Sequence, residues 1–202
     1  METAHPSSRL FVAVAVPVDV RHRLEETRLE LRAHLDAEGV SWTQPEKFHL
    51  TVRFLGKVAS DRIPMLTTAL AEVAEVIAPF DLVAGGLGCF PNLRHPRVVW
   101  AGIHDTTGTL RALRHRVNMA TAPFAEEPAD EEFVGHITIA RLKRARRAEL
   151  EFVAGFIHRF KKRVLGSWRA DELLLMASEL RREGSRYACL ARLAFHGDAK
   201  ME

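Results

Sequence analysis

The chain has 202 residues, of which 47% are hydrophobic and 27% are charged, and its formal net charge is +3. This composition excludes a disordered, collagen-like or low-complexity chain, and the length allows one large domain or two small lobes. The small positive charge permits an anionic partner but does not indicate a protein that coats nucleic acid.

Two features of the sequence predict a cytoplasmic protein that does not associate with membranes. Cys89 and Cys189 lie far apart and outside any CxxC motif, which is typical of a reduced compartment rather than of a secreted disulfide framework. The apolar run Leu10–Val16 is too short to span a membrane, and it lacks the basic flank of a signal peptide.

Hydrophobic periodicity predicts strands and helices that follow one another along the whole chain. In chain order, the predicted strands are Leu10–Val16, Phe48–Leu55, Phe80–Leu87, Val98–Ile103, Phe133–Arg141, Leu173–Ala177 and Tyr187–Phe195. The predicted helices that lie between them are Asp19–Asp36, Ile63–Ile77, Thr109–Met119 and Arg146–Phe160. Because nothing in this order requires a doubly wound sheet, we predict an α+β fold of two similar lobes, one in each half of the chain.

One short pattern, His followed by an apolar residue, Thr and a second apolar residue, occurs twice. The copies are residues 49–52 (His-Leu-Thr-Val) and residues 136–139 (His-Ile-Thr-Ile), and both lie in predicted strands. Because side chains alternate along a strand, each His shares a face with its Thr while the apolar residues enter the core. Each strand is therefore expected to present an imidazole and a hydroxyl to the same space.

Two such pairs suit a displacement at phosphorus. One imidazole can accept a proton while the other donates one, because both titrate near neutral pH. Threonine hydroxyls can donate hydrogen bonds to phosphoryl oxygens. A single His in a strand is more often structural than catalytic, so the chemical interpretation depends on the occurrence of two copies.

With these motifs the chain resembles the 2H phosphoesterases, in particular the RNA 2',3'-cyclic phosphodiesterases, also called 2'-5' RNA ligases. The segments that carry the resemblance are RLFVAVAVP (9–17), WTQPEKF (42–48), HLTVRFLG (49–56), GGLGCFP (85–91), PRVVWAGI (96–103), GHITIARL (135–142) and a closing LLLMASEL (173–180) with Tyr187. The resemblance implies that residues 1–202 form a single bilobal domain of antiparallel sheets and helices. The lobes would be related by a pseudo-twofold axis around a central cleft, and each would contribute one motif.

The resemblance also implies an activity and roles for five residues. The activity is hydrolysis of 2',3'-cyclic phosphate ends of RNA to 2'-phosphomonoesters, and the same site could join RNA ends through a 2',5' bond in the reverse direction. The enzyme would be a monomer that uses neither a metal nor a cofactor. His49 would be the proton donor and His136 the proton acceptor, although the near-symmetry makes these roles easy to exchange. Thr51, Thr138 and Arg141 would bind the phosphate.

Strand parity gives two arginines opposite expectations. Arg141 falls on the face opposite His136, so it needs a β-bulge or a strand end to reach the site, and a plain surface position is the alternative. Arg53 has the parity of His49 and would face the site.

Several features leave alternatives open. The basic segments 143–147 and 161–163 either attract RNA or are solvated surface, and Trp42, Phe90 and Trp168 either stack on a base or pack in the core. The remaining histidines form no metal-binding pattern. Other functions compatible with the motifs are hydrolysis of 2',5'-oligonucleotides or small cyclic phosphates, and nucleotide or RNA binding without catalysis.

Overall fold

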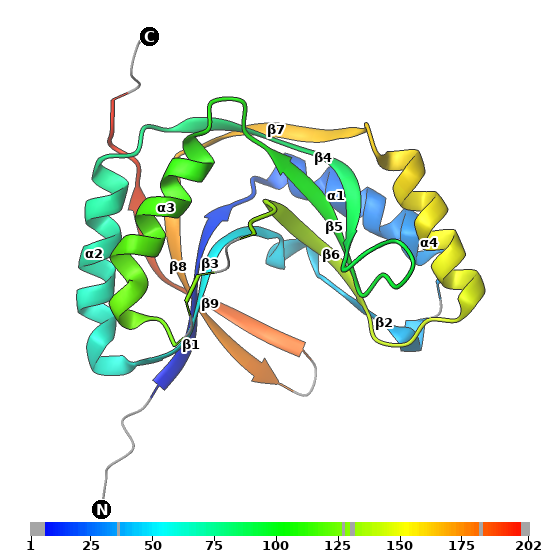
Figure 1. Ribbon diagram of the computed structural model, residues 1–202, viewed down its shortest axis with the longest axis horizontal. Helices are drawn as coiled ribbons and strands as arrows, with labels where there is room; N and C mark the ends of the chain where they lie inside the picture. The colour runs from blue at the N-terminus through cyan, green and yellow to red at the C-terminus, as the bar shows by residue number, and fades with distance from the viewer. Residues whose placement is uncertain (1–6, 36, 127, 130–131, 182–183, 199–202) are drawn as a thin grey trace, which may run out of the picture.

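The computed structural model describes residues 7–35, 37–126, 128–129, 132–181 and 184–198. The strands in this part of the chain form two antiparallel sheets (Figure 1). One sheet has four strands in the order β3-β1-β8-β9, and the other has five in the order β2-β6-β5-β4-β7. The predicted α+β fold with antiparallel sheets is therefore confirmed.

The bounds of the elements are as follows. The strands are β1 (Ser7–Ala15), β2 (Val40–Trp42), β3 (His49–Ala59), β4 (Phe80–Phe90), β5 (Val98–His104), β6 (His136–Leu142), β7 (Val164–Ala170), β8 (Glu172–Arg181) and β9 (Gly184–Ala194). The α-helices are α1 (Val18–Arg32), α2 (Ile63–Glu75), α3 (Thr109–Thr121) and α4 (Arg147–Phe160). Short 3₁₀ helices cover Ala37–Gly39, Pro45–Lys47, Ser60–Arg62 and Ala122–Phe124.

Strands β2 and β7 were not predicted, and β6 begins at His136 rather than at Phe133. Strand β2 is only three residues long, which is too short to show a periodicity. The alternation of β7 is interrupted at Gly166, whose φ is +149°, and a Cβ there would lie 2.9 Å from Cγ2 of Val20. The close approach of α1 therefore explains why this strand contains a glycine.

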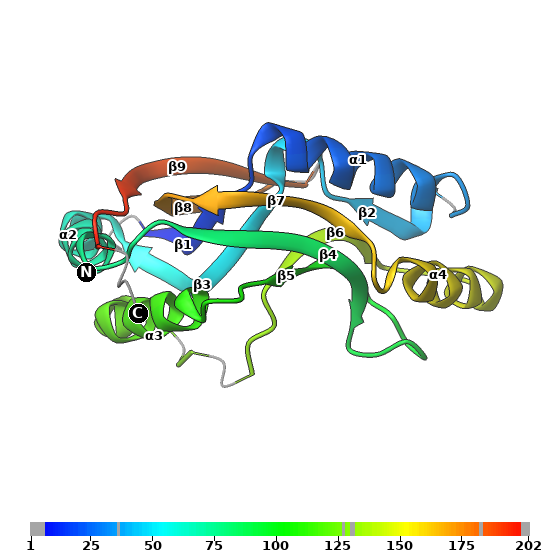
Figure 2. The same cartoon turned by 90° about the horizontal axis from the view of Figure 1, so that it is seen from above.

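The two sheets do not correspond to successive halves of the chain, so that part of the prediction is wrong. The four-stranded sheet combines β1 and β3 with the last two strands, β8 and β9. Helices α2 and α3 contact this sheet, whereas α1 and α4 contact the five-stranded sheet (Figures 1 and 2). Each lobe is thus completed by elements from distant parts of the sequence.

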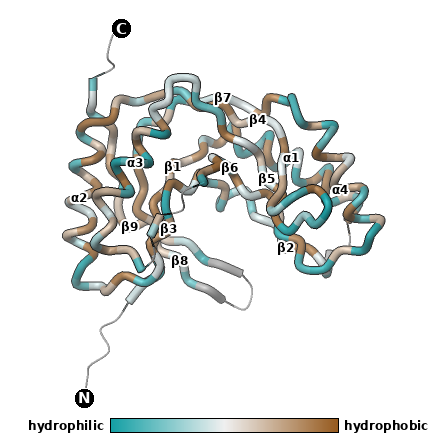
Figure 3. The backbone as a smooth tube through the Cα atoms, in the orientation of Figure 1, coloured by the Kyte–Doolittle hydropathy of each residue, from teal (hydrophilic) through white to brown (hydrophobic). Residues whose placement is uncertain are grey.

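Strand β1 lies at the centre of the four-stranded sheet, and both of its faces are buried. Leu10, Val12 and Val14 belong to the hydrophobic core, while Phe11 and Ala13 on the other face are also almost fully buried. Figure 3 shows the hydrophobic character of β1, in contrast to the hydrophilic loop between β4 and β5. Among the described helices, none has both the length and the apolar character needed to cross a membrane.

Candidate active site

The two motifs open strands of different sheets. His49 is the first residue of β3 and His136 is the first residue of β6, and these two strands contact each other. In each motif the His and the Thr are half-buried, whereas the residue between them, Leu50 or Ile137, is fully buried. The predicted sharing of a face by His and Thr is confirmed in both strands.

Both imidazoles are held by the same kind of hydrogen bond. His49 Nδ1 lies 2.7 Å from the carbonyl oxygen of Lys47, and His136 Nδ1 lies 2.7 Å from the carbonyl oxygen of Val134. Because a carbonyl oxygen can only accept, Nδ1 carries the hydrogen in both rings. Each imidazole is therefore left with Nε2 as the nitrogen that exchanges protons.

Aromatic rings flank each imidazole. The ring centroid of His49 is 4.9 Å from that of Phe11 and 5.4 Å from that of Tyr187. The centroid of His136 is 5.0 Å from that of Phe90 and 6.1 Å from that of Trp100. These contacts fix the orientation of the rings and remove water from their faces.

A β-bulge lies at the same place in both motifs. Strand β3 runs antiparallel to β1. Thr51 is opposite Ala13 and Arg53 is opposite the adjacent Val12, so Val52 has no partner in β1 and is the extra residue. In the pairing of β6 with β5, the register passes from Thr138 to Ala140 in the same way, and Ile139 is the extra residue. Each bulge reverses the parity of the residues that follow it.

The bulges decide the positions of the two arginines. Arg141 is exposed beyond its bulge and lies close enough to both histidines for its charge to lower their pKa values, so the predicted bulge is confirmed. The expectation for Arg53 is wrong: its side chain is only 7% exposed, and its Nη1 donates to the carbonyl oxygen of Asn118 in α3. Simple alternation fails for both residues because each strand contains one residue more than its partner.

The counterpart of Arg141 in the first motif is Phe54, which stands five residues after His49 as Arg141 stands five after His136. Phe54 is 67% exposed, and its ring centroid is 5.9 Å from that of Phe11. With Arg9 and Tyr187 it lines a cavity of about 300 Å³ beside His49. The sequence analysis did not single out Phe54 as a site residue; its place five residues after His49 was the available signal.

Comparisons with known proteins agree with this geometry. A family model described as LigT like Phosphoesterase matches residues 14–100. An RNA 2',3'-cyclic phosphodiesterase of Archaeoglobus fulgidus is 31% identical over 179 residues, which cover 89% of this chain and 96% of that relative. The chain belongs to the LigT-like phosphoesterases. The resemblance to the 2H phosphoesterases is thereby confirmed.

Solved structures show the same fold for this LigT-like phosphoesterase. A protein of Thermus thermophilus superposes with a TM-score of 0.77 and 28% identity, over 95% of this chain and all of that chain. Escherichia coli LigT, crystallised with phosphate, superposes with a TM-score of 0.68 and 25% identity, over 94% of this chain and 98% of that one.

The electrostatics of the LigT-like site favour the neutral imidazoles. Burial lowers the pKa of both His49 and His136 below the ordinary value of 6.5, and the carbonyl hydrogen bond partly offsets this effect in each ring. The positive charge of Arg141 lowers the pKa of both histidines further, and a protonated His136 also lowers the pKa of His49. The state in which both imidazoles are protonated is therefore disfavoured.

The pH dependence of activity follows from these directions. A donor and an acceptor need one proton between them, so kcat/KM is expected to follow a bell-shaped curve. The active form has one protonated and one neutral histidine. Because burial lowers both histidine pKa values below 6.5, this form loses its remaining proton as the pH rises through the lowered values. The maximum of kcat/KM should therefore lie below pH 6.5. Steady-state kinetics with a 2',3'-cyclic mononucleotide check this, and a maximum above pH 7.5 would contradict it.

The other candidate residues divide between the site and the surface. Phe90 contacts His136, whereas Trp42 and Trp168 pack against the hydrophobic core. In the segment 143–147, Arg146 and Arg147 form ion pairs with carboxylates of α4, as expected for a solvated surface. In the part of the chain that the structure describes, no group of three or more His, Cys, Asp or Glu side chains is placed to hold a metal ion.

Proposed function

We propose that this protein hydrolyses 2',3'-cyclic phosphate ends of RNA to 2'-phosphomonoesters. The observation that carries the proposal is the matched pair of histidines, each fixed through Nδ1 to a carbonyl oxygen and each presenting Nε2. The relatives named RNA 2',3'-cyclic phosphodiesterase support the substrate, and a bound phosphate in E. coli LigT supports the type of ligand.

In the proposed reaction, Nε2 of His136 accepts a proton from a water molecule whose oxygen attacks the phosphorus. The bond between phosphorus and O3' breaks as Nε2 of protonated His49 donates its proton to that oxygen. The water supplies one hydroxyl group to the phosphorus, and the product is a 2'-phosphomonoester beside a free 3'-hydroxyl. Both proton transfers are supplied by side chains, so this step needs no metal.

The remaining predicted residues would stabilise the charge on the phosphate. Thr51 and Thr138 are half-buried on the faces of their histidines, and their hydroxyls would donate to the two non-bridging oxygens. The Arg141 guanidinium would neutralise the charge that develops on these oxygens in the transition state. The site thus combines neutral donors from both sheets with one cation.

The direct test is the product formed from an RNA oligonucleotide with a 2',3'-cyclic phosphate end in the presence of EDTA. We expect full activity and a 2'-phosphate, identified by chromatography against the authentic 2'- and 3'-phosphates. A 3'-phosphate would contradict the proposed leaving oxygen, and binding without turnover would favour a module that only binds RNA. Small cyclic phosphates in parallel reactions test the alternative substrate class. A monomeric state and a cytoplasmic location stay predictions.

A further inference from the structure

Hydrogen-bond donors form a row across the four-stranded sheet, on the face where Tyr187 contacts His49. Arg9 in β1 is directly opposite Lys57 in β3 on one side and Ser178 in β8 on the other. Ser178 is in turn directly opposite Tyr187 in β9. Because residues that are opposite each other in antiparallel strands share a face, these four side chains lie side by side. We call Lys57, Arg9, Ser178 and Tyr187 the donor row.

The donor row shares a cavity with the aromatic rings that flank His49. Phe11 lies two residues after Arg9 on the same face of β1, and its ring centroid is 4.9 Å from that of His49. The side chains that line the cavity of about 300 Å³ include Arg9, Phe11, Phe54, Ser178 and Tyr187. Thr51 is opposite Ala13, four residues from Arg9, so strand spacing places the donor row about 13 Å from this threonine along the sheet.

The two cations of the donor row have no counter-charge among the described residues. Arg9 and Lys57 are both exposed and directly opposite each other, an arrangement of like charges that destabilises a sheet. In the ranges that the structure describes, neither side chain forms an ion pair. Glu126 also lines the cavity, but its carboxylate accepts a hydrogen bond from the backbone N–H of Lys57 at 2.8 Å. An anion held between the two cations would remove their repulsion.

We propose that the donor row binds the phosphate that precedes the terminal nucleotide of the RNA substrate. The inference rests on the proposed function, which places the cyclic phosphate between Thr51 and Thr138. One nucleotide separates the two phosphates, and the long side chains of Arg9 and Lys57 span the rest of the distance between Thr51 and the donor row. The guanidinium and the ammonium group bind the negative charge, and the Ser178 hydroxyl donates a further hydrogen bond. The enzyme thereby binds RNA ends more tightly than cyclic mononucleotides.

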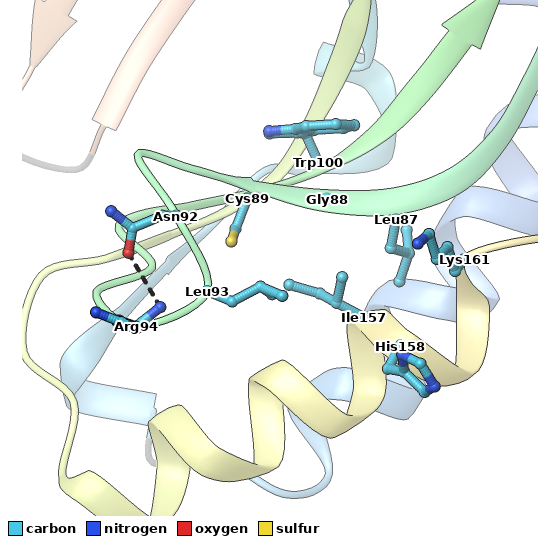
Figure 4. A pocket seen from close by; sticks show the side chains of 10 residues that line it. All are labelled: Leu87, Gly88, Cys89, Asn92, Leu93, Arg94, Trp100, Ile157, His158 and Lys161. Atoms are coloured by element: carbon cyan, nitrogen blue, oxygen red, sulfur yellow. Dashed lines mark hydrogen bonds between the residues drawn. The ribbon is translucent and has the colours of Figure 1, made fainter.

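Arg94 and Lys161 are a matched pair of cations in another part of the molecule. Both are exposed and line a cavity of about 720 Å³ between β4 and α4 (Figure 4). Trp100 packs against Gly88 on one face of the five-stranded sheet, where its ring centroid is 6.1 Å from that of His136. The cavity lies on the opposite face, into which the neighbours of Gly88 in β4 point (Figure 4). Substitution of this pair therefore controls for a general loss of positive charge.

The test measures KM for a dinucleotide and a mononucleotide that both end in a 2',3'-cyclic phosphate, of which only the dinucleotide has a preceding phosphate. Arg9→Gln/Lys57→Gln is expected to raise KM for the dinucleotide about tenfold at unchanged kcat, because it removes two charge-assisted contacts. The control, Arg94→Gln/Lys161→Gln, should leave both KM values unchanged. A cyclic mononucleotide with a 5'-phosphate should respond like the dinucleotide. Thermal melts should show no loss of stability in Arg9→Gln/Lys57→Gln, because a repulsion between like charges is also removed.

Equal KM values of the two double variants for the dinucleotide would overturn the assignment, and so would an equal rise of KM for the mononucleotide with a free 5'-hydroxyl. If a 5'-phosphate on the mononucleotide makes no difference, the donor row does not bind this phosphate. Wild-type protein that hydrolyses the dinucleotide and the mononucleotide with the same KM would refute the inference and leave the proposed function intact. Failure to hydrolyse either substrate would instead refute the proposed function itself.

Discussion

His49→Ala and His136→Ala are each expected to lower kcat/KM for cyclic-phosphate hydrolysis by roughly 10²- to 10⁴-fold, the usual contribution of a general acid or base. The rings of Phe11 and Phe90 and the backbone carbonyls that contact the two imidazoles carry no proton that could be exchanged in their place. The double variant should be little worse than the single variants, because the two groups act in one step.

The control for this loss is His22→Ala, which removes an exposed imidazole from α1 and should leave activity unchanged. Circular dichroism checks that each variant is folded. A substrate whose leaving group needs no proton should restore turnover in His49→Ala but not in His136→Ala. Restoration in His136→Ala would exchange the two roles, and full turnover of ordinary substrate by the double variant would refute acid–base catalysis by this pair.

Arg141→Met is expected to lower kcat/KM by about 10²- to 10³-fold, comparable to the loss of one donor that stabilises a transition-state oxyanion. It should also move the pH–activity curve, because the positive charge of Arg141 lowers the pKa of His49 and His136. Without that charge both pKa values rise, so both limbs of the curve move to higher pH. A loss of activity without this displacement would mean that Arg141 lies outside the site.

Arg53→Met is the matched control, since strand parity alone would place Arg53 in the site and Arg141 on the opposite face. Arg53 is buried and donates to the half-buried backbone carbonyl of Asn118 in α3, so its replacement removes this hydrogen bond. We expect unfolding to become easier by about 1–3 kcal/mol. We also expect the pH–activity curve to keep its position. Thermal melts and kinetics below the melting temperature separate the two effects.

The sequence predicted those features that depend on local periodicity. The long helices α2 and α4 and the faces of the two motif strands follow from apolar spacing within one element. The pairing of β1 with β8 joins residues more than 150 positions apart, and no local pattern reports it. The assignment of elements to lobes could not be read from the chain for this reason.

The same limit applies within the site. A bulge is a property of two strands, because it exists only where one has a residue that its partner lacks. The sequence showed that Arg141 needs a bulge to reach the histidines, but the registers of β3 with β1 and of β6 with β5 decide which arginine lies near them. The contact between Trp100 and Gly88 likewise depends on the pairing of β4 with β5.

The paired bulges leave each lobe one side-chain position that can change independently of the core. Phe54 and Arg141 occupy it, both exposed, while the neighbouring Arg53 and Ala140 are buried. Selection could therefore give one lobe an aromatic surface and the other a cation without repacking either sheet. The two motif strands therefore share a backbone pattern but differ in charge and aromatic character at the position five residues after each histidine.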